Sequence, residues 1–179
     1  MPDDKKDIER ALQEGLDALE EALRGIEEES AHMKPRPEAW SVVDCVDHIA
    51  LTEEALFSRL EEAKPSDRSH ADPARELRFR DLALNRARRI DAPDPVLPRR
   101  ESQTFAQALE AFHAVRRRTM AFVHDFNGDL RSSLTMHPLI TRPVNCYEML
   151  LLMSFHPARH AQQITEIREQ LLPPRGQMK

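Results

Sequence analysis

The sequence predicts an all-α fold, a four-helix bundle with one long crossover. Its 179 residues include only four glycines, and aromatic residues make up 5%. This leaves little of the turn chemistry and strand-forming content of a many-stranded fold. Four segments instead repeat apolar residues every three or four positions, as the buried face of a helix does. The length suits one core, so we expect a single domain at 1–172 and a C-terminal tail at 173–179.

The first two helices are marked by periodicity and by a start signal. One helix is predicted from Asp7 to about Ala31, with apolar residues at regular helical spacing, namely Ile8, Leu12, Leu16, Leu19, Leu23 and Ile26. Prolines break the chain after it. A second helix is expected to begin near Ser41, because Ser41 and Asp44 are spaced as in a capping box.

The second half of the bundle follows a proline-rich, charged stretch at 64–100. We expect this stretch to be the long crossover between the second and third helices, with a short helix around Ala74–Arg89. The third helix begins at Thr104 and ends at Asn127-Gly128, a C-terminal signal. The fourth is predicted from about Asn145 to Leu172, before two prolines.

Charge and hydropathy exclude several classes of protein. A formal net charge of -5 argues against nucleic acid as the partner, although arginines crowd the crossover. No apolar run approaches the roughly 20 residues that span a bilayer, and the first residues lack a signal-like apolar segment. We therefore expect a cytoplasmic protein without a membrane partner. Its two cysteines are expected to be reduced thiols.

The candidate chemistry lies in two histidines of the fourth helix. His156 and His160 are four residues apart, which places both imidazoles on one helix face. Burying both without a partner would be costly, and a shared cation would satisfy them. His48, at the edge of the second helix's buried face, is the third candidate. Pro157 removes an amide donor and clashes with the carbonyl of Met153, so the fourth helix is expected to kink. The kink either builds the site or spoils its geometry.

Two motifs resemble those of a known family, the DinB-like proteins. The first runs from Trp40-Ser41 to His48-Ile49, and the second joins His156, Arg159, His160, Gln163 and Ile164. The pair His137-Pro138 also resembles a family element before the last helix. The resemblance spans the chain from the first helix to about Leu172.

The resemblance implies an up-down-down-up helix order and a divalent metal ion, zinc or nickel, held by His48, His156 and His160. Three imidazoles leave coordination positions open, as in catalytic sites, so that a bound water or thiol can become a nucleophile. Asp44, Asp47 and Gln163 are candidates to orient the imidazoles.

Similar proteins include transferases and isomerases that use a low-molecular-weight thiol. The leading hypothesis is therefore a metal-dependent thiol S-transferase or related detoxification enzyme, acting on a small-molecule thiol and an electrophile. Arg80 is the candidate to hold a carboxylate of the thiol cofactor. Two alternatives stay open: a metal-dependent hydrolase, in which the ion activates water, and a non-catalytic, stress-related bundle that forms a homodimer.

The remaining candidate residues have plainer interpretations. Cys45, one turn before His48, is either a further ligand or a small apolar core residue. His137 precedes a proline and is expected to cap a loop or line the pocket. The other histidines are expected at the surface, namely His32, His70, His113 and His124.

Overall fold

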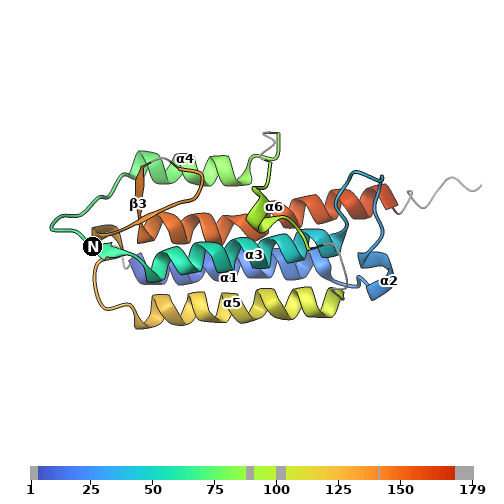
Figure 1. Cartoon of the computed structure of the whole chain (residues 1–179), viewed down its shortest axis with the longest axis horizontal. Helices are drawn as coiled ribbons and strands as arrows, with labels where there is room; N and C mark the ends of the chain where they lie inside the picture. Colours follow the sequence, from blue (N-terminus) through green and yellow to red (C-terminus); the bar gives the residue numbers. More distant parts are fainter. Residues whose placement is uncertain (1–3, 88–90, 100–103, 141, 172–179) are drawn as a thin grey trace, which may run out of the picture.

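Four long helices make up the body of the molecule, which is described by a computed structural model covering residues 4–87, 91–99, 104–140 and 142–171. Their bounds are α1 Asp4–Leu23, α3 Val42–Glu61, α5 Phe105–Asp125 and α6 Cys146–Leu171. Figure 1 shows them side by side along the long axis of the molecule. The predicted helical class is confirmed. The tail expected at 173–179 lies outside the described residues.

The first helix is shorter than the sequence predicted. It ends at Leu23, and Gly25 then takes a positive φ of 74°, the left-handed conformation that favours glycine after a helix. Residues 28–31 form a separate short helix, α2, Glu28–Ala31. The prediction of one helix to Ala31 was therefore wrong at its C-terminal end.

The start signals of the next helices agree with the prediction. At α3 the Ser41 hydroxyl accepts from the Asp44 amide, and the Asp44 carboxylate accepts from the Ser41 amide. At α5 the same reciprocal pair forms between Thr104 and Gln107. Each pair satisfies amides that the first helical turn leaves without partners.

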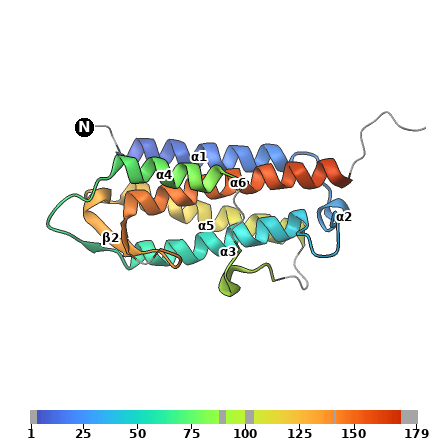
Figure 2. The same cartoon turned by 90° about the horizontal axis from the view of Figure 1, so that it is seen from above.

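The segment between α3 and α5 crosses two faces of the bundle. It holds α4, Pro73–Leu84, whose N-terminus is capped by Asp72, and the 3-10 turn η1, Asp94–Val96. α4 lies along α6, and η1 lies against α3 on the outside of the bundle (Figure 2). The helix predicted at 74–89 is shorter than expected, and Arg88 and Arg89 lie outside the described residues.

A small sheet at one end of the bundle was not predicted. Its strands are β1 Lys64–Pro65, β2 Ser133–Met136 and β3 Pro143–Asn145, paired antiparallel in the order β1-β2-β3. The register pairs Leu134 with Lys64 on one side and with Asn145 on the other. Strands this short carry no readable alternation, so sequence patterning does not reveal them.

The interior divides into two apolar clusters with polar side chains between them. One cluster holds Ile8, Leu12, Leu56 and Met153 among others, and the second holds Leu19, Ile49, Phe112 and Ile164 among others. The residues between them form a polar layer, defined as Glu53, Arg116, Thr119 and Ser154, all buried. At this level α1 and α6 approach closely, because a Cβ at Gly15 would lie 2.1 Å from the Ser154 carbonyl oxygen.

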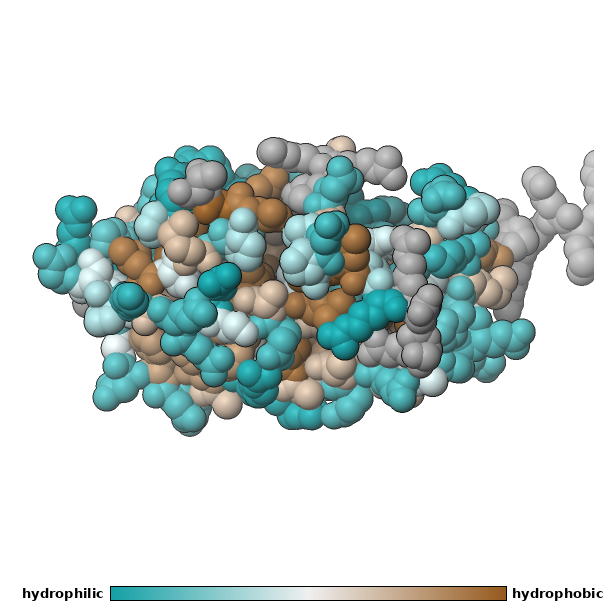
Figure 3. Space-filling view, in the orientation of Figure 1, coloured by the Kyte–Doolittle hydropathy of each residue, from teal (hydrophilic) through white to brown (hydrophobic). Residues whose placement is uncertain are grey.

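The face of the molecule shown in Figure 3 is mostly hydrophilic. Figure 3 shows one face of the molecule, on which hydrophobic side chains gather near the middle and polar ones cover most of the remainder. Among the described residues, no helix is long and apolar enough to cross a membrane.

Candidate metal centre

His48 is held in place by the segment between α3 and α5. It lies in the second turn of α3, and its Nδ1 is 2.7 Å from the carbonyl oxygen of Val96 in η1. A carbonyl oxygen only accepts, so Nδ1 carries the hydrogen and donates it. The other ring nitrogen, Nε2, is therefore left with its lone pair free to bind a ligand.

His156 and His160 face each other one turn apart on α6. The helix continues through Pro157, and the two Nε2 atoms are 3.1 Å apart. The predicted i,i+4 geometry is therefore preserved across the proline. Of the two outcomes considered for Pro157, the structure shows the one in which the His156 and His160 side chains lie close together.

The three histidines form one cluster. Their candidate ligand atoms all lie within 4.8 Å of one another, and they are the only such group among the described His, Cys, Asp and Glu residues. The imidazole centroids are 4.6 to 5.1 Å apart. Trp40 stacks on His160 at 6.0 Å and also approaches His48. The tryptophan ahead of α3 thus forms a wall of the site.

Gln163 orients the ring of His160. Its Oε1 lies 3.0 Å from His160 Nδ1 and 3.3 Å from a guanidinium nitrogen of Arg86, which in turn pairs with Glu166. A guanidinium only donates, so the amide oxygen faces both groups and accepts from Nδ1. His160, like His48, therefore presents Nε2 to the cluster.

The two aspartates considered as orienting residues have other partners. Asp44 caps α3 and pairs with Lys34 at 3.0 Å. Asp47 accepts from the backbone amide of Arg99 at 2.7 Å, three residues after Val96. Asp47 thus helps to fasten the segment whose carbonyl orients His48, but it does not bond to an imidazole itself.

Burial favours the neutral form of the three imidazoles. Desolvation lowers the pKa of His48, and it lowers the pKa values of His156 and His160 well below their usual range. Mutual repulsion among the three rings adds to the effect on His156 and His160. Metal ions bind the neutral form of imidazole, so protons compete weakly for this site at neutral pH.

The donor set fits a divalent transition metal. Two nitrogens bound to one tetrahedral zinc ion at about 2.0–2.1 Å lie roughly 3.3 Å apart, close to the separation of the His156 and His160 Nε2 atoms. Three neutral nitrogens also match the preferences of zinc and nickel better than those of magnesium or calcium. His48, His156 and His160 are thus the residues that would hold the ion.

The other predicted candidate residues are not members of the histidine cluster. Cys45 is fully buried in an apolar cluster, where desolvation raises its pKa, and it is not one of the three clustered ligands. Arg80 is exposed on α4, with its guanidinium 6.0 Å from the ring centre of Phe155, the residue before His156. His137 Nδ1 accepts from the Leu139 amide, the loop-capping role that was expected.

Sequence reasoning missed the backbone partner of His48 and the anchor of α4. Val96 contributes a carbonyl, which every residue has, so no side-chain pattern marks it. Arg159 donates to the carbonyl oxygens of Ala83 and Asn85 and so ties the end of α4 to α6 between the two histidines. Its presence in the H-x-x-R-H motif was the available signal.

Comparisons with known proteins agree with this picture. A curated relative, the uncharacterized protein YuaE of Bacillus subtilis, is 22% identical over 151 residues, which cover 83% of this chain and 90% of YuaE. YfiT from Bacillus subtilis, described as a probable metal-dependent hydrolase with an unusual four-helix bundle topology, superposes with a TM-score of 0.59 at 16% identity. The match covers 96% of this chain and 89% of YfiT.

A conserved protein from Enterococcus faecalis superposes with a TM-score of 0.61 at 15% identity, covering 92% of this chain and 95% of its own. At such identities the two solved structures establish the shared fold. The family model of the DinB superfamily matches residues 11–164, a range that contains all three histidines. The chain therefore belongs to the DinB superfamily.

Proposed function

We propose that this protein is a metal-dependent enzyme that binds one divalent ion, zinc or nickel, through His48, His156 and His160. The observation that carries the proposal is the convergence of three imidazoles, two of which have Nδ1 engaged elsewhere and Nε2 left for a ligand. A three-histidine site leaves coordination positions open, and a metal bound there would lower the pKa of a coordinated thiol or water.

The nucleophile that we propose first is a low-molecular-weight thiol, attacking a small electrophile. Arg80 supports this assignment, because it is exposed on α4 and its guanidinium lies over Phe155, next to His156. A guanidinium there can form a bidentate ion pair with a carboxylate of the thiol cofactor. Trp40, stacked on His160, provides an apolar wall for the electrophile.

The second candidate function is a metal-dependent hydrolase. It is favoured by the likeness to YfiT, described as a probable metal-dependent hydrolase, and it uses the same three histidines. In this case water replaces the thiol, and no thiol-binding arginine is needed. Both functions accord with an up-down-down-up order of the four long helices, which we include in the proposal together with the crossover from α3 to α5.

The decisive experiment begins with the metal. The chain is purified without a histidine tag or metal column, and its metal content is measured by mass spectrometry before and after incubation with zinc or nickel. About one ion per chain is expected for a single three-histidine site. Failure to bind either ion would overturn the proposal and leave the histidines as packed core residues.

Turnover of electrophiles and of ester or amide substrates, with and without added thiols, then separates the two functions. Arg80→Ala is expected to raise the KM for the thiol and to leave metal content unchanged. Arg78→Ala, which removes another exposed arginine of the same helix, is the matched control. Turnover that needs no thiol and is indifferent to Arg80→Ala would assign the hydrolase function.

A further inference from the structure

Pro157 leaves a gap in the hydrogen bonding of α6. In an α-helix the carbonyl of residue 153 accepts from the amide of residue 157, but proline has no amide hydrogen. The Met153 carbonyl oxygen is not left without a donor, because a guanidinium nitrogen of Arg116 in α5 lies 3.0 Å from it. A side chain from another helix thus takes the place of the missing amide.

Arg116 is itself held from several sides. Its side chain is only 1% exposed, and it donates to the Leu12 carbonyl of α1 at 2.9 Å and to the Glu53 carboxylate of α3 at 2.6 Å. Thr119, one turn along α5, donates to the other oxygen of the same carboxylate. Arg116 therefore connects α1, α3, α5 and α6 at a single level, the polar layer between the two apolar clusters.

This level adjoins the metal-binding turn. Met153 and Pro157 bracket His156, and His160 follows three residues after Pro157. The charge of Arg116 is close enough to contribute to the lowered pKa of His156. Moreover, Gly15 brings α1 into close contact with Ser154, so this part of α6 is packed directly against a neighbouring helix.

We propose that Arg116 is a positioning residue for the candidate metal centre: by donating to the Met153 carbonyl that Pro157 leaves open, it fixes the turn of α6 that aligns His156 with His160. The inference rests on the proposed metal site. It assigns to Arg116 a role beyond core stability, since metal ligands function only when their orientation is set by surrounding hydrogen bonds.

The physical basis is the cost of a buried acceptor without a donor. Removing Arg116 from this layer leaves the Met153 carbonyl unsatisfied, and α6 can recover a partner only by changing its bend at Pro157 or by admitting water. Either change rotates His156 relative to His160. Restoring an amide at position 157 should therefore remove the need for Arg116.

The test is a double-mutant cycle on zinc affinity. Arg116→Lys keeps a cation for Glu53, but one ammonium group cannot reproduce the fork that reaches Leu12, Met153 and Glu53 together. Pro157→Ala returns the amide donor to the Met153 carbonyl. Thr119→Val is the matched control, since it removes a bond to Glu53 in the same layer and leaves the Arg116 to Met153 contact intact. Affinity is measured by competition with a chromophoric chelator.

We expect Arg116→Lys to weaken zinc binding about 10- to 100-fold, the usual effect of losing an outer-shell partner. Pro157→Ala alone and Thr119→Val should change the affinity much less, and the double variant Arg116→Lys, Pro157→Ala should recover most of the loss. Equal losses in Arg116→Lys and Thr119→Val, or no recovery in the double variant, would overturn the proposal.

A second measurement keeps this inference separate from the proposed function. Nitrogen-15 NMR of the imidazoles is recorded on the metal-free proteins. Arg116→Lys should shift the His156 signals, and the double variant should return them toward wild type. If the wild type binds no metal, the metal proposal fails, while these shifts still decide the role of Arg116. Unchanged His156 signals in Arg116→Lys would refute it.

Discussion

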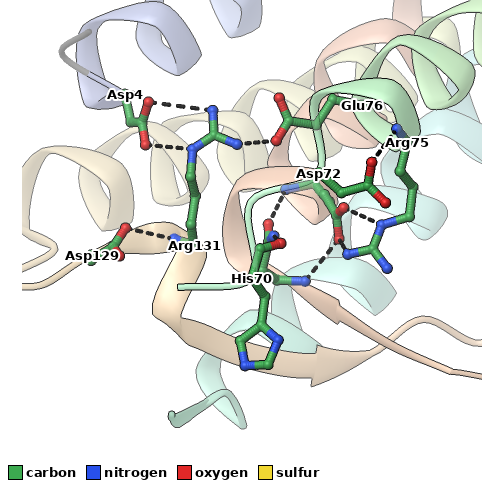
Figure 4. Close-up of polar contacts among 9 residues, drawn as sticks. Asp4, His70, Asp72, Arg75, Glu76, Asp129 and Arg131 are labelled. Carbon is green, nitrogen blue, oxygen red and sulfur yellow. Dashed lines mark hydrogen bonds and ion pairs between the residues drawn. The ribbon is translucent and has the colours of Figure 1, made fainter. Parts of the chain in front are cut away.

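Two regions of the protein bury polar side chains in opposite ways. At the end of the bundle that carries the sheet, buried and half-buried charges meet opposite charges. Glu148 pairs with Arg75, and Arg131 pairs with Asp4 and Glu76 (Figure 4). In the histidine cluster, three side chains of one kind face each other, and all of them have lowered pKa values.

The end of the bundle that carries the sheet needs no ligand to satisfy its charged side chains. The Glu148 side chain is fully buried, and it accepts from Arg75 and from the Asn145 amide, while the Asn145 side chain accepts from the Glu148 amide to cap α6. Arg131 also lies over the ring of Tyr147 at 3.7 Å. These contacts join α1, α4 and α6, so their role is to fix the fold.

The histidine cluster contains no opposite charge, and its internal bond joins the Nε2 atoms of His156 and His160 at 3.1 Å. Two of its imidazoles have their outer nitrogens bonded to Val96 and Gln163, and their inner nitrogens converge where no carboxylate among the described residues completes the set. Buried polar groups arranged in this way are satisfied by a cation. Buried charges that are all paired within the protein therefore indicate a structural role, whereas imidazole nitrogens that converge without an opposite charge indicate a binding site.

The largest effect, on metal content, should follow from removing two of the three imidazoles of the cluster. The double variant His156→Ala, His160→Ala is expected to lose the ion, because a single remaining imidazole cannot hold it. Metal content by mass spectrometry is the measurement. The control is His113→Ala, His124→Ala, which removes two histidines outside the cluster; retention of metal by the first variant would contradict the assignment.

Removing the ion pair between Arg75 and Glu148 should lower the stability of the protein and leave metal binding unchanged. Glu148→Ala leaves Arg75 without its carboxylate partner and the Asn145 amide without its acceptor, so we expect the free energy of unfolding to fall by about 3 kcal/mol or more. Denaturant unfolding measures this change. Full metal occupancy in the folded variant is part of the prediction, and loss of metal with unchanged stability would reverse the roles of the two regions.

The pH dependence of the metal-free protein sharpens the contrast. Because folding lowers the pKa values of His156 and His160, the unfolded chain binds more protons as the pH falls below about 6.5, the ordinary pKa of histidine. Stability is therefore full above that pH and declines as the pH falls toward the folded-state pKa values. Denaturant unfolding between neutral and mildly acidic pH should show this decline, and His156→Ala, His160→Ala should flatten it.

The smallest effect is expected from a charge pair that neither region contains. Arg118 and Glu54 are both about half exposed and bond at 2.7 Å. Solvent screens such a pair, so Glu54→Ala should change the free energy of unfolding by less than about 1 kcal/mol. A change as large as that of Glu148→Ala would show that burial is not what separates the two kinds of pair.

The long helices could be predicted from the sequence because their positions depend on residues that are close together in the chain. Apolar spacing located the long helices, and the capping-box spacing of Ser41 and Asp44 marked where α3 begins. The spacing of His156 and His160 placed both on one face of α6. Gly25, which follows the end of α1, was a further sequence signal for a helix end. The helix was predicted to continue past it because apolar residues recur as far as Ile26.

The sequence by itself thus determined the helical class, the positions of the long helices and the pair of histidines on α6, since these depend on residues a few positions apart. Arg116, which lies one turn after Phe112 on the buried face of α5, was not among the residues predicted to be buried. Its partners were not visible.

Only the tertiary structure decided which groups meet. It brought His48 to the pair on α6, placed the Val96 carbonyl on His48, set Gln163 against Arg86, and put Arg116 against the carbonyl that Pro157 leaves open. The short strands at 64–65, 133–136 and 143–145 likewise exist through pairing with one another. The four side-chain contacts join residues far apart in the chain, and two of them use backbone carbonyls, which every residue carries and no local pattern distinguishes.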